Sequence, residues 1–147
     1  MSLNQKLRDD LKESMRNGDS LRRSVIRLLL SAIKNEEIRV GKELDDDGII
    51  SVLFRQAKQR RESIEAYSKA DRKDLLEQET GELNVILQYL PSQMSSEELT
   101  DIISKVIEES GAKEISDIGR VMGPVMKLVK SRASGSDVRE IVNKLLN

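Results

Sequence analysis

Hydrophobic residues recur at intervals of three and four along most of the chain, which is the spacing of one face of an α-helix. Alternating runs of β-branched and aromatic residues, which are typical of strands, do not occur in the sequence. Helix-starting polar residues and helix-ending glycines separate the periodic stretches. The pattern therefore predicts an all-α fold, with four helices in the first part of the chain and three in the second.

The four earlier helices are delimited by local signals. A serine or aspartate precedes each of the first three, and glycine follows the first two, as expected for helix starts and ends. Pro91 should end the fourth helix, because proline disfavours helical geometry at the residue before it. The expected spans are residues 2–18, 19–41, 45–67 and 71–90.

Three shorter helices are expected in the remaining residues. Ser95 with Glu98 forms a capping box for the first of them, and Gly111 should end it. Ser116 should cap the next helix. Pro124 lies within that helix and removes a backbone hydrogen bond, so we expect a bend or an irregular start there.

Pro91 also marks the expected domain boundary. Residues 1–91 are predicted to form an N-terminal four-helix domain, and residues 92–147 a small C-terminal three-helix bundle. Residues 92–117 contain two basic and seven acidic residues, whereas residues 118–147 contain six basic and two acidic ones. This asymmetry indicates a polyanionic partner at the positive end of the C-terminal bundle.

Composition excludes several kinds of chemistry. The 147 residues contain neither cysteine nor histidine, which removes disulfides, cysteine or histidine zinc ligands, thiol nucleophiles and histidine bases. The phosphate-binding sequence G-x-x-x-x-G-K-[ST] is also absent. Only Phe54, Tyr67 and Tyr89 are aromatic, too few to stack several bases. We therefore predict no catalytic residue, no cofactor and no metal site, and expect any nucleic-acid contact to involve phosphates and shape.

Two acidic clusters have structural explanations. The run Asp45 to Asp47 lacks the alternate spacing of a calcium loop and suits a helix start, where negative charge is favourable. Glu77, Glu79 and Glu82 have no accompanying nucleophile or base, and they are expected to pair with basic residues of the third helix.

Basic residues also gather on the second and third helices. Either they face solvent and pair with nearby carboxylates, or they bind phosphate, and the sequence leaves both readings open. They are Arg22, Arg23 and Arg27 on the second helix and Arg55, Lys58, Arg60 and Arg61 on the third.

The end of the sixth helix carries the strongest candidate site. Basic side chains alternate there with an apolar face, and a turn follows them. Such residues can simply stabilise the negative end of the helix dipole, or they can form a phosphate-binding patch. The candidate nucleic-acid-binding residues are Arg120, Lys127, Lys130 and Arg132.

The sequence resembles a known family. The run GRVMGPVMKLVKSRASGSDVREIVNKLL, residues 119–146, is similar to the C-terminal module of the YqeY-like family. That module is related to the tail domain of the GatB component of the glutamine-dependent aspartyl/glutamyl-tRNA amidotransferase. The segments LRRSVIRLLLSAIKNEEI, KQRRESIEAYSKADRKDLLEQETGEL and YLPSQMSSEEL also resemble the family, so the similarity spans nearly the whole chain.

The resemblance implies an accessory module that binds tRNA, associated with carbon–nitrogen ligase activity that uses glutamine as amido-nitrogen donor. It also implies an amidotransferase or an aminoacyl-tRNA synthetase as partner. A protein–protein adaptor that binds a partner helix, without nucleic acid, is the alternative. The first ten residues lack the apolar core of a signal peptide, and no run of about eighteen apolar residues occurs, so we expect a cytoplasmic protein without a membrane partner.

Overall fold

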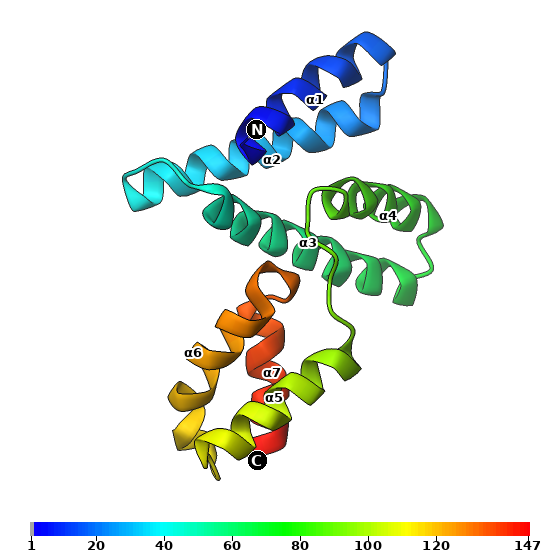
Figure 1. Cartoon of the computed structure of the whole chain (residues 1–147). Coiled ribbons are helices and arrows are strands. Elements are labelled where there is room, and N and C mark those ends of the chain that lie inside the picture. Colours follow the sequence, from blue (N-terminus) through cyan, green and yellow to red (C-terminus); the bar gives the residue numbers. More distant parts are fainter. Residues whose placement is uncertain (1) are drawn as a thin grey trace. The chain divides into compact units, whose positions relative to one another are not determined.

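The computed structural model describes residues 2–147, apart from the side chain of Ser131. Across these residues the regular structure consists of seven α-helices and two short 3-10 helices, without strands. The all-α prediction is therefore confirmed. The chain divides into two compact units, Met1–Leu90 and Pro91–Asn147, and each is described separately (Figure 1).

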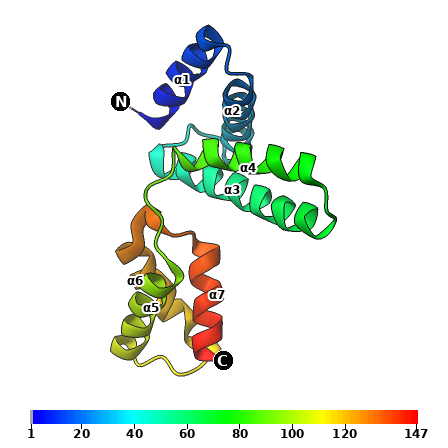
Figure 2. The ribbon, with the colours of Figure 1, turned by 90° about the vertical axis from the view of Figure 1, so that its right-hand side faces the viewer.

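The first unit consists of two antiparallel helix pairs. Its helices are α1 (Leu3–Asn17), α2 (Ser20–Val40), α3 (Asp46–Lys69) and α4 (Lys73–Leu87). Helix α1 pairs with α2 and α3 pairs with α4, while α2 also contacts both α3 and α4 (Figures 1 and 2). The residues most completely buried between the pairs are Leu7, Ile26, Leu29, Ile33, Ile49, Leu53 and Ile86.

Local capping explains where most of these helices begin and end. The Ser2 hydroxyl accepts a hydrogen bond from the Gln5 amide at 3.1 Å, and Gly18 ends α1 with a left-handed φ of 67°. At the start of α3, the Asp45 carboxylate accepts a bond from the Gly48 amide at 2.8 Å. Side-chain oxygens thus satisfy amides that have no partner inside the helix.

Helix α4 is shorter than the predicted span 71–90 at both ends. Asp71 has a left-handed φ of 54° and lies before the helix. After Leu87 the chain tightens, because the amides of residues 88–90 bond to carbonyls three positions earlier. This turn directs Tyr89 and Leu90 into the core, where they are only 6% and 9% exposed.

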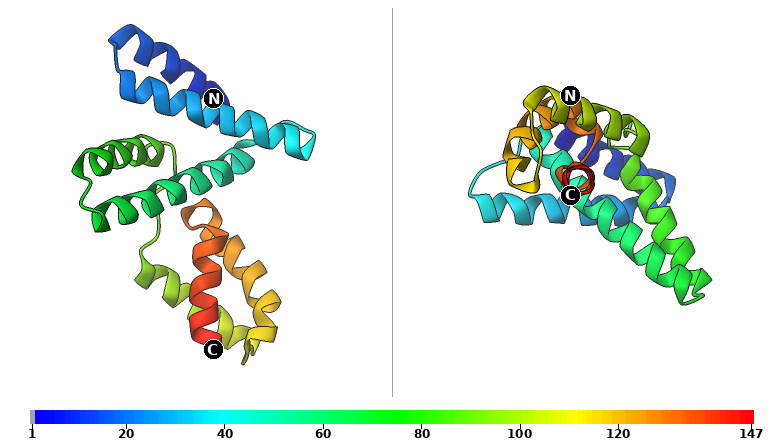
Figure 3. Two further views of the ribbon diagram at one scale, coloured as in Figure 1. Left: turned by 180° about the vertical axis from the view of Figure 1, so that it is seen from behind. Right: turned by 90° about the horizontal axis from the view of Figure 1, so that it is seen from below.

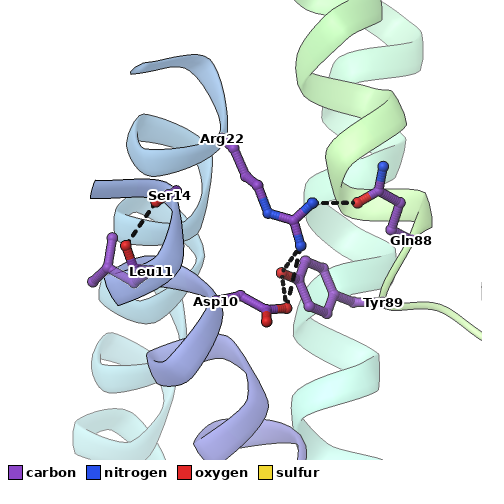
Figure 4. A network of polar contacts seen from close by, with 6 residues as sticks. All are labelled: Asp10, Leu11, Ser14, Arg22, Gln88 and Tyr89. Carbon is purple, nitrogen blue, oxygen red and sulfur yellow. Dashed lines mark hydrogen bonds and ion pairs between the residues drawn. The ribbon is translucent and has the colours of Figure 1, made fainter. Parts of the chain in front are cut away.

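A polar network joins α1, α2 and the end of α4 (Figure 4). The Tyr89 hydroxyl donates to Asp10 Oδ2 at 2.6 Å and accepts from Arg22 Nη2 at 3.0 Å. Arg22 also forms an ion pair with Asp10 at 3.2 Å and donates to Gln88 Oε1 at 3.0 Å. Burial and the Asp10 carboxylate raise the pKa of Tyr89, so the phenol stays protonated as a donor.

The second unit is a three-helix arrangement. It contains α5 (Ser96–Ser110), η1 (Ile115–Asp117), α6 (Ile118–Val129), η2 (Lys130–Arg132) and α7 (Gly135–Leu146). Each of the three α-helices contacts the other two, and the left view of Figure 3 shows α6 and α7 side by side. Its fully buried side chains are Ile103, Val121, Val125, Val129, Val138 and Val142.

The start of α6 differs from the prediction. Ser116 does not cap this helix, because it lies inside η1. Asp117 is the N-cap residue of α6 but makes no side-chain hydrogen bond to that helix. Its Oδ2 accepts the amides of Lys113 at 3.0 Å and Glu114 at 3.4 Å, and the second bond belongs to the capping box of η1. The expected irregular start is thus present as η1, and the helix continues through Pro124 to Val129.

The second unit should fold alone. A fragment of residues 91–147 keeps the whole Val-rich core, so we expect a helical circular-dichroism spectrum and a cooperative thermal transition, with a stability of about 3 kcal/mol. Val125→Asp in this fragment should abolish the transition by burying an unpaired charge. A fragment that is unfolded at 10 °C would contradict the domain boundary at Pro91.

Tyr89→Phe should destabilise the first unit by about 2 kcal/mol, because it removes hydrogen bonds to two charged groups. Tyr67→Phe is the control, since no hydrogen bond of the Tyr67 hydroxyl is found among the described residues. Because its folded pKa is raised, Tyr89 stabilises fully below pH 10 and this contribution is lost as the pH rises further. Urea unfolding at pH 7 and above pH 10 measures both effects, and equal midpoints for the two variants would refute the role of the network.

Candidate nucleic-acid interface

The packing of α6 determines which of its residues reach solvent. Val121, Val125 and Val129 are completely buried against α5 and α7. The opposite side of the helix is exposed along its whole length. We call this side the α6 outer face; it consists of Gly119, Arg120, Gly123, Pro124, Lys127 and Leu128.

Two of the predicted basic residues lie together on the α6 outer face. Arg120 and Lys127 are seven positions apart, which is about two helical turns and returns to nearly the same direction. Lys130 follows directly after the helix, exposed and with a left-handed φ of 51°. Neither Lys127 nor Lys130 forms an ion pair with the residues that the structure describes.

Arg120 is only loosely paired. Its guanidinium lies 3.6 Å from Asp117, and its side chain is 65% exposed. The Asp117 carboxylate already accepts backbone amides, chiefly that of Lys113, and these bonds lower its pKa. An exposed pair of this kind contributes little to stability, so Arg120 can exchange Asp117 for another anion.

Arg132 has a different environment from the other three residues. Its Nε donates to the Ser92 carbonyl at 2.9 Å, and its Nη2 lies 3.6 Å from Glu98. The Arg132 carbonyl in turn accepts the Met94 amide at 2.9 Å. The side chain therefore holds the segment before α5 against η2 and is partly occupied by contacts within the protein.

Sequence reasoning missed the two glycines of the α6 outer face. Gly119 and Gly123 lie inside a helix without positive φ, and a Cβ at either position would meet no atom within 4 Å. Glycine in a helix interior costs about 1 kcal/mol relative to alanine, and no neighbouring atom in the described structure requires it here. The sequence signal that could have found them is the spacing of four residues between Gly119 and Gly123, which places both glycines on the same side of a helix.

Structural contacts engage three of the seven candidate basic residues of α2 and α3. Arg22 belongs to the network with Asp10, and Arg55 lies 3.4 Å from Glu36 beside a polar cleft of about 300 Å³ between α2 and α3. Arg60 Nε lies 3.5 Å from Glu82, and Arg60 is only 9% exposed. For these three arginines the structure favours the ion-pair reading.

Two of the three α4 carboxylates predicted as partners of the third helix interact with this buried arginine, Glu82 through the ion pair and Glu79 through its charge. Arg60 donates to Gln56 Oε1 at 2.6 Å in addition to its ion pair with Glu82. Burial raises the pKa of Glu79, the Glu82 charge raises it further, and Arg60 opposes both. A raised carboxyl pKa also occurs in structural ion-pair networks, so it does not identify a catalytic acid.

The acidic run at residues 45–47 serves the start of α3. Asp45 caps the helix, and Asp46 Oδ1 accepts the Leu3 amide at 3.0 Å. Within residues 2–147, no three or more acidic side chains are grouped so that they could hold a metal ion. None of the described helices is both long enough and apolar enough to cross a membrane.

Comparison with known proteins identifies the family. A model of the family described as "Yqey-like protein" matches residues 4–146. This chain belongs to the YqeY-like family. The resemblance seen in the sequence is therefore confirmed over almost the full length of the chain.

Three yeast relatives of this YqeY-like chain share one name, "Altered inheritance of mitochondria protein 41, mitochondrial". The protein of Lachancea thermotolerans is 36% identical over 134 residues, which cover 90% of this chain and 71% of the relative. That of Saccharomyces cerevisiae is 33% identical over 127 residues, covering 81% and 68%. That of Kluyveromyces lactis is 39% identical over 84 residues, covering 56% and 45%.

These names contradict the expected cytoplasmic location. All three relatives are named as mitochondrial proteins. The expectation rested on the absence of a signal-peptide core in the first ten residues. Mitochondrial transit peptides lack such a core as well, since they are amphipathic and basic, so its absence did not justify a cytoplasmic assignment.

Glu82→Gln should destabilise the first unit by about 3 kcal/mol, because it leaves the buried Arg60 without its counter-charge. The double variant Arg60→Met/Glu82→Leu removes both charges and should lie close to the parent. Urea unfolding of the full chain tests both variants. A single variant as stable as the parent would show that the ion pair does not stabilise the fold.

Proposed function

We propose that this YqeY-like chain is an accessory tRNA-binding module and that the α6 outer face, with Lys130, contacts tRNA phosphates. In this proposal residues 92–147 form a three-helix domain that carries the contact surface, and residues 1–91 form a four-helix domain. The observation that supports it most is the unpaired state of Lys127 and Lys130 among the described residues, on or next to an exposed helix face.

Electrostatics gives this surface its preference for a polyanion. Acidic residues predominate before α6, whereas residues from Ile118 onward carry a net positive charge. Three cations, Arg120, Lys127 and Lys130, are exposed there without a strong internal partner. Phosphates that neutralise them would release bound counterions, which provides sequence-independent affinity. Arg132 is a positioning residue in this proposal, because it holds the neighbouring loop.

The proposed role is to hold tRNA for a partner enzyme. The chain contains no cysteine or histidine and no phosphate-binding loop of the kind used by many ATP-dependent enzymes. Amide transfer, if the chain is involved in it, would therefore use the active site of a partner such as an amidotransferase or an aminoacyl-tRNA synthetase. The chain would contribute tRNA affinity and orientation.

One feature favours a second candidate function, a protein adaptor. Leu128 is 60% exposed at the edge of the α6 outer face. Exposed leucines are common anchors for an amphipathic partner helix. A partner helix bound there would depend on Leu128 and little on salt concentration, so the two candidates respond differently to the same measurement.

Binding of tRNA should depend on salt through about three phosphate contacts. The slope of log affinity against log salt should be about −2.1 to −2.7, so a fourfold rise in salt should weaken binding roughly 20- to 40-fold. The variant Lys127→Ala/Lys130→Ala should flatten the slope by about 1.4 to 1.8. Filter binding between 50 and 200 mM salt measures both values.

A matched control removes two lysines elsewhere in the same unit. Lys105→Ala/Lys144→Ala changes the net charge equally, and the two residues are exposed on α5 and α7. This control should bind tRNA with nearly the slope of the parent. If both double variants behave alike, binding is non-specific. If tRNA does not bind even at 50 mM salt, the adaptor takes precedence, and Leu128→Ser becomes the variant to examine.

A further inference from the structure

The first unit contains a polar cleft that the proposed function does not use. It lies between α2 and α3 and has a volume of about 300 Å³. The polar side chains that line it are Asn35, Glu36 and Arg39 of α2, and Arg55, Gln56 and Gln59 of α3. This volume is at the lower end of the range for small-molecule sites. The cleft can therefore take a small polar molecule.

A partly buried carboxylate brings the two arginines of the cleft together. Arg39 Nε donates to Glu36 Oε2 at 3.0 Å, and Arg55 Nη2 lies 3.4 Å from the same oxygen. The Glu36 side chain is only 15% exposed, whereas those of both arginines are more than half exposed. Hydrogen bonds from Arg39 lower the pKa of Glu36 although burial opposes them, so the carboxylate stays ionised. Two cations share one anion, which leaves a positive charge at the cleft.

The contacts with Glu36 do not use all the donors of these arginines. Arg39 bonds to the carboxylate through Nε and Nη2, and Arg55 contacts it through Nη2. The Nη1 groups of both arginines, and Nε of Arg55, have no contact among the described residues. Guanidinium groups bind carboxylates and phosphates with parallel hydrogen bonds, so the free N–H groups can hold an anionic ligand.

The carboxamides of the cleft add further hydrogen-bonding groups. Gln56 Oε1 accepts from Arg60 Nη1 at 2.6 Å, which leaves the Gln56 amide nitrogen as a donor. No hydrogen bond of the Asn35 or Gln59 side chain is found in the part of the chain that the structure describes. Each of these two carboxamides offers donors and an acceptor. They can therefore bind hydroxyl groups or ring nitrogens beside the anion.

We propose that the cleft between α2 and α3 binds the phosphate monoester of a small polar metabolite. Arg39 and Arg55 would hold the phosphate, and the carboxamides would hydrogen-bond to the carbon skeleton that carries it. This site lies in the first unit and does not depend on the tRNA surface proposed for α6.

The number of donors favours phosphate over carboxylate. A carboxylate has two oxygens, whereas a phosphate monoester has three acceptor oxygens and up to two negative charges. The free nitrogens of Arg39 and Arg55, together with the amide nitrogen of Gln56, supply more donors than a carboxylate could accept. A phosphate matches this excess better.

The cleft is less suited to a nucleoside triphosphate. Such ligands usually bind with Mg²⁺, which the protein holds through one or two carboxylates. Glu36 is the one carboxylate that lines the cleft, and two arginines already engage it. The arginines must therefore neutralise the ligand themselves, which favours a single phosphate group.

The first arm of the test titrates the full chain with small molecules by calorimetry at about 100 mM salt. Ribose 5-phosphate and adenosine 5′-monophosphate represent a sugar phosphate and a nucleotide. At least one should bind with 1:1 stoichiometry and a Kd of about 1 mM or below, and the tighter one identifies the source of the phosphate. Ribose should not bind, and inorganic phosphate and succinate should bind about 10-fold more weakly. If neither monoester saturates the protein, or if succinate binds as tightly, the proposal is wrong.

The second arm uses variants of the cleft. Arg39→Gln and Arg55→Gln should each weaken binding of the tighter monoester about 10-fold, which is one step in the equilibrium constant per 1.4 kcal/mol. Arg27→Gln on α2 and Arg61→Gln on α3 are the matched controls, because both residues are exposed and neither lines the cleft. If controls and cleft variants bind alike, the ligand does not occupy the cleft.

A third variant protects the test against loss of folding. Gln59→Glu adds a negative charge at an exposed position of the cleft, where it should weaken monoester binding about 10-fold while the melting temperature stays that of the parent. Asn84→Asp makes the same change of charge on the exposed side of α4 and should bind like the parent. Equal binding by these two variants would contradict the proposal even if the arginine variants unfold.

The outcomes are independent of the proposed function. Lys127→Ala/Lys130→Ala should bind the monoester like the parent, because both lysines belong to the second unit. If this variant loses monoester binding, the ligand binds at α6 and the cleft proposal fails. If tRNA does not bind but the cleft variants weaken monoester binding as expected, the tRNA proposal fails and the cleft proposal stands.

Discussion

The burial of three valines determines the orientation of α6, and with it the position of every candidate RNA contact. Val121, Val125 and Val129 repeat every four residues and are fully buried. A rotation of the helix by one residue, about 100°, would bring them toward solvent. Each would then lose about 1.5 to 3 kcal/mol of burial energy. Arg120 and Lys127 therefore face solvent because of what the other side of the helix buries, and they need no contact of their own to stay there.

Basic residues that look alike in the sequence have separate roles in the structure. Lys130 and Arg132 are two positions apart, yet only Arg132 is tied to the protein, through Ser92 and Glu98. Arg60 is likewise interleaved with exposed cations on α3 but is buried against Glu82. In both cases the partner is distant in the sequence, so no local pattern could separate the paired cations from the unpaired ones.

Local signals predicted the fold where local forces decide it. Caps at Ser2 and Ser95 and left-handed glycines at the ends of α1, α2 and α5 were all readable, because each acts within one helical turn. The end of α4 was not readable. Tyr89 leaves the helix to reach Asp10, 79 positions away, and this contact outweighs the helical pattern of residues 88–90. The glycines of the α6 outer face were missed because the analysis of periodicity considers the apolar residues of a helix and not its exposed glycines.

The composition of α6 makes its outer face dependent on the rest of the bundle. Gly119, Gly123 and Pro124 are all poor helix formers, with costs of about 1 kcal/mol for each glycine and about 3 kcal/mol for an interior proline. A segment of 12 residues with this composition would not be helical in isolation. Packing of its valines against α5 and α7 therefore keeps the helix formed. Core substitutions in this unit should consequently disturb the α6 outer face even though they change no exposed residue. Effects on binding can therefore be distinguished from effects on stability only with substitutions confined to the exposed side of α6.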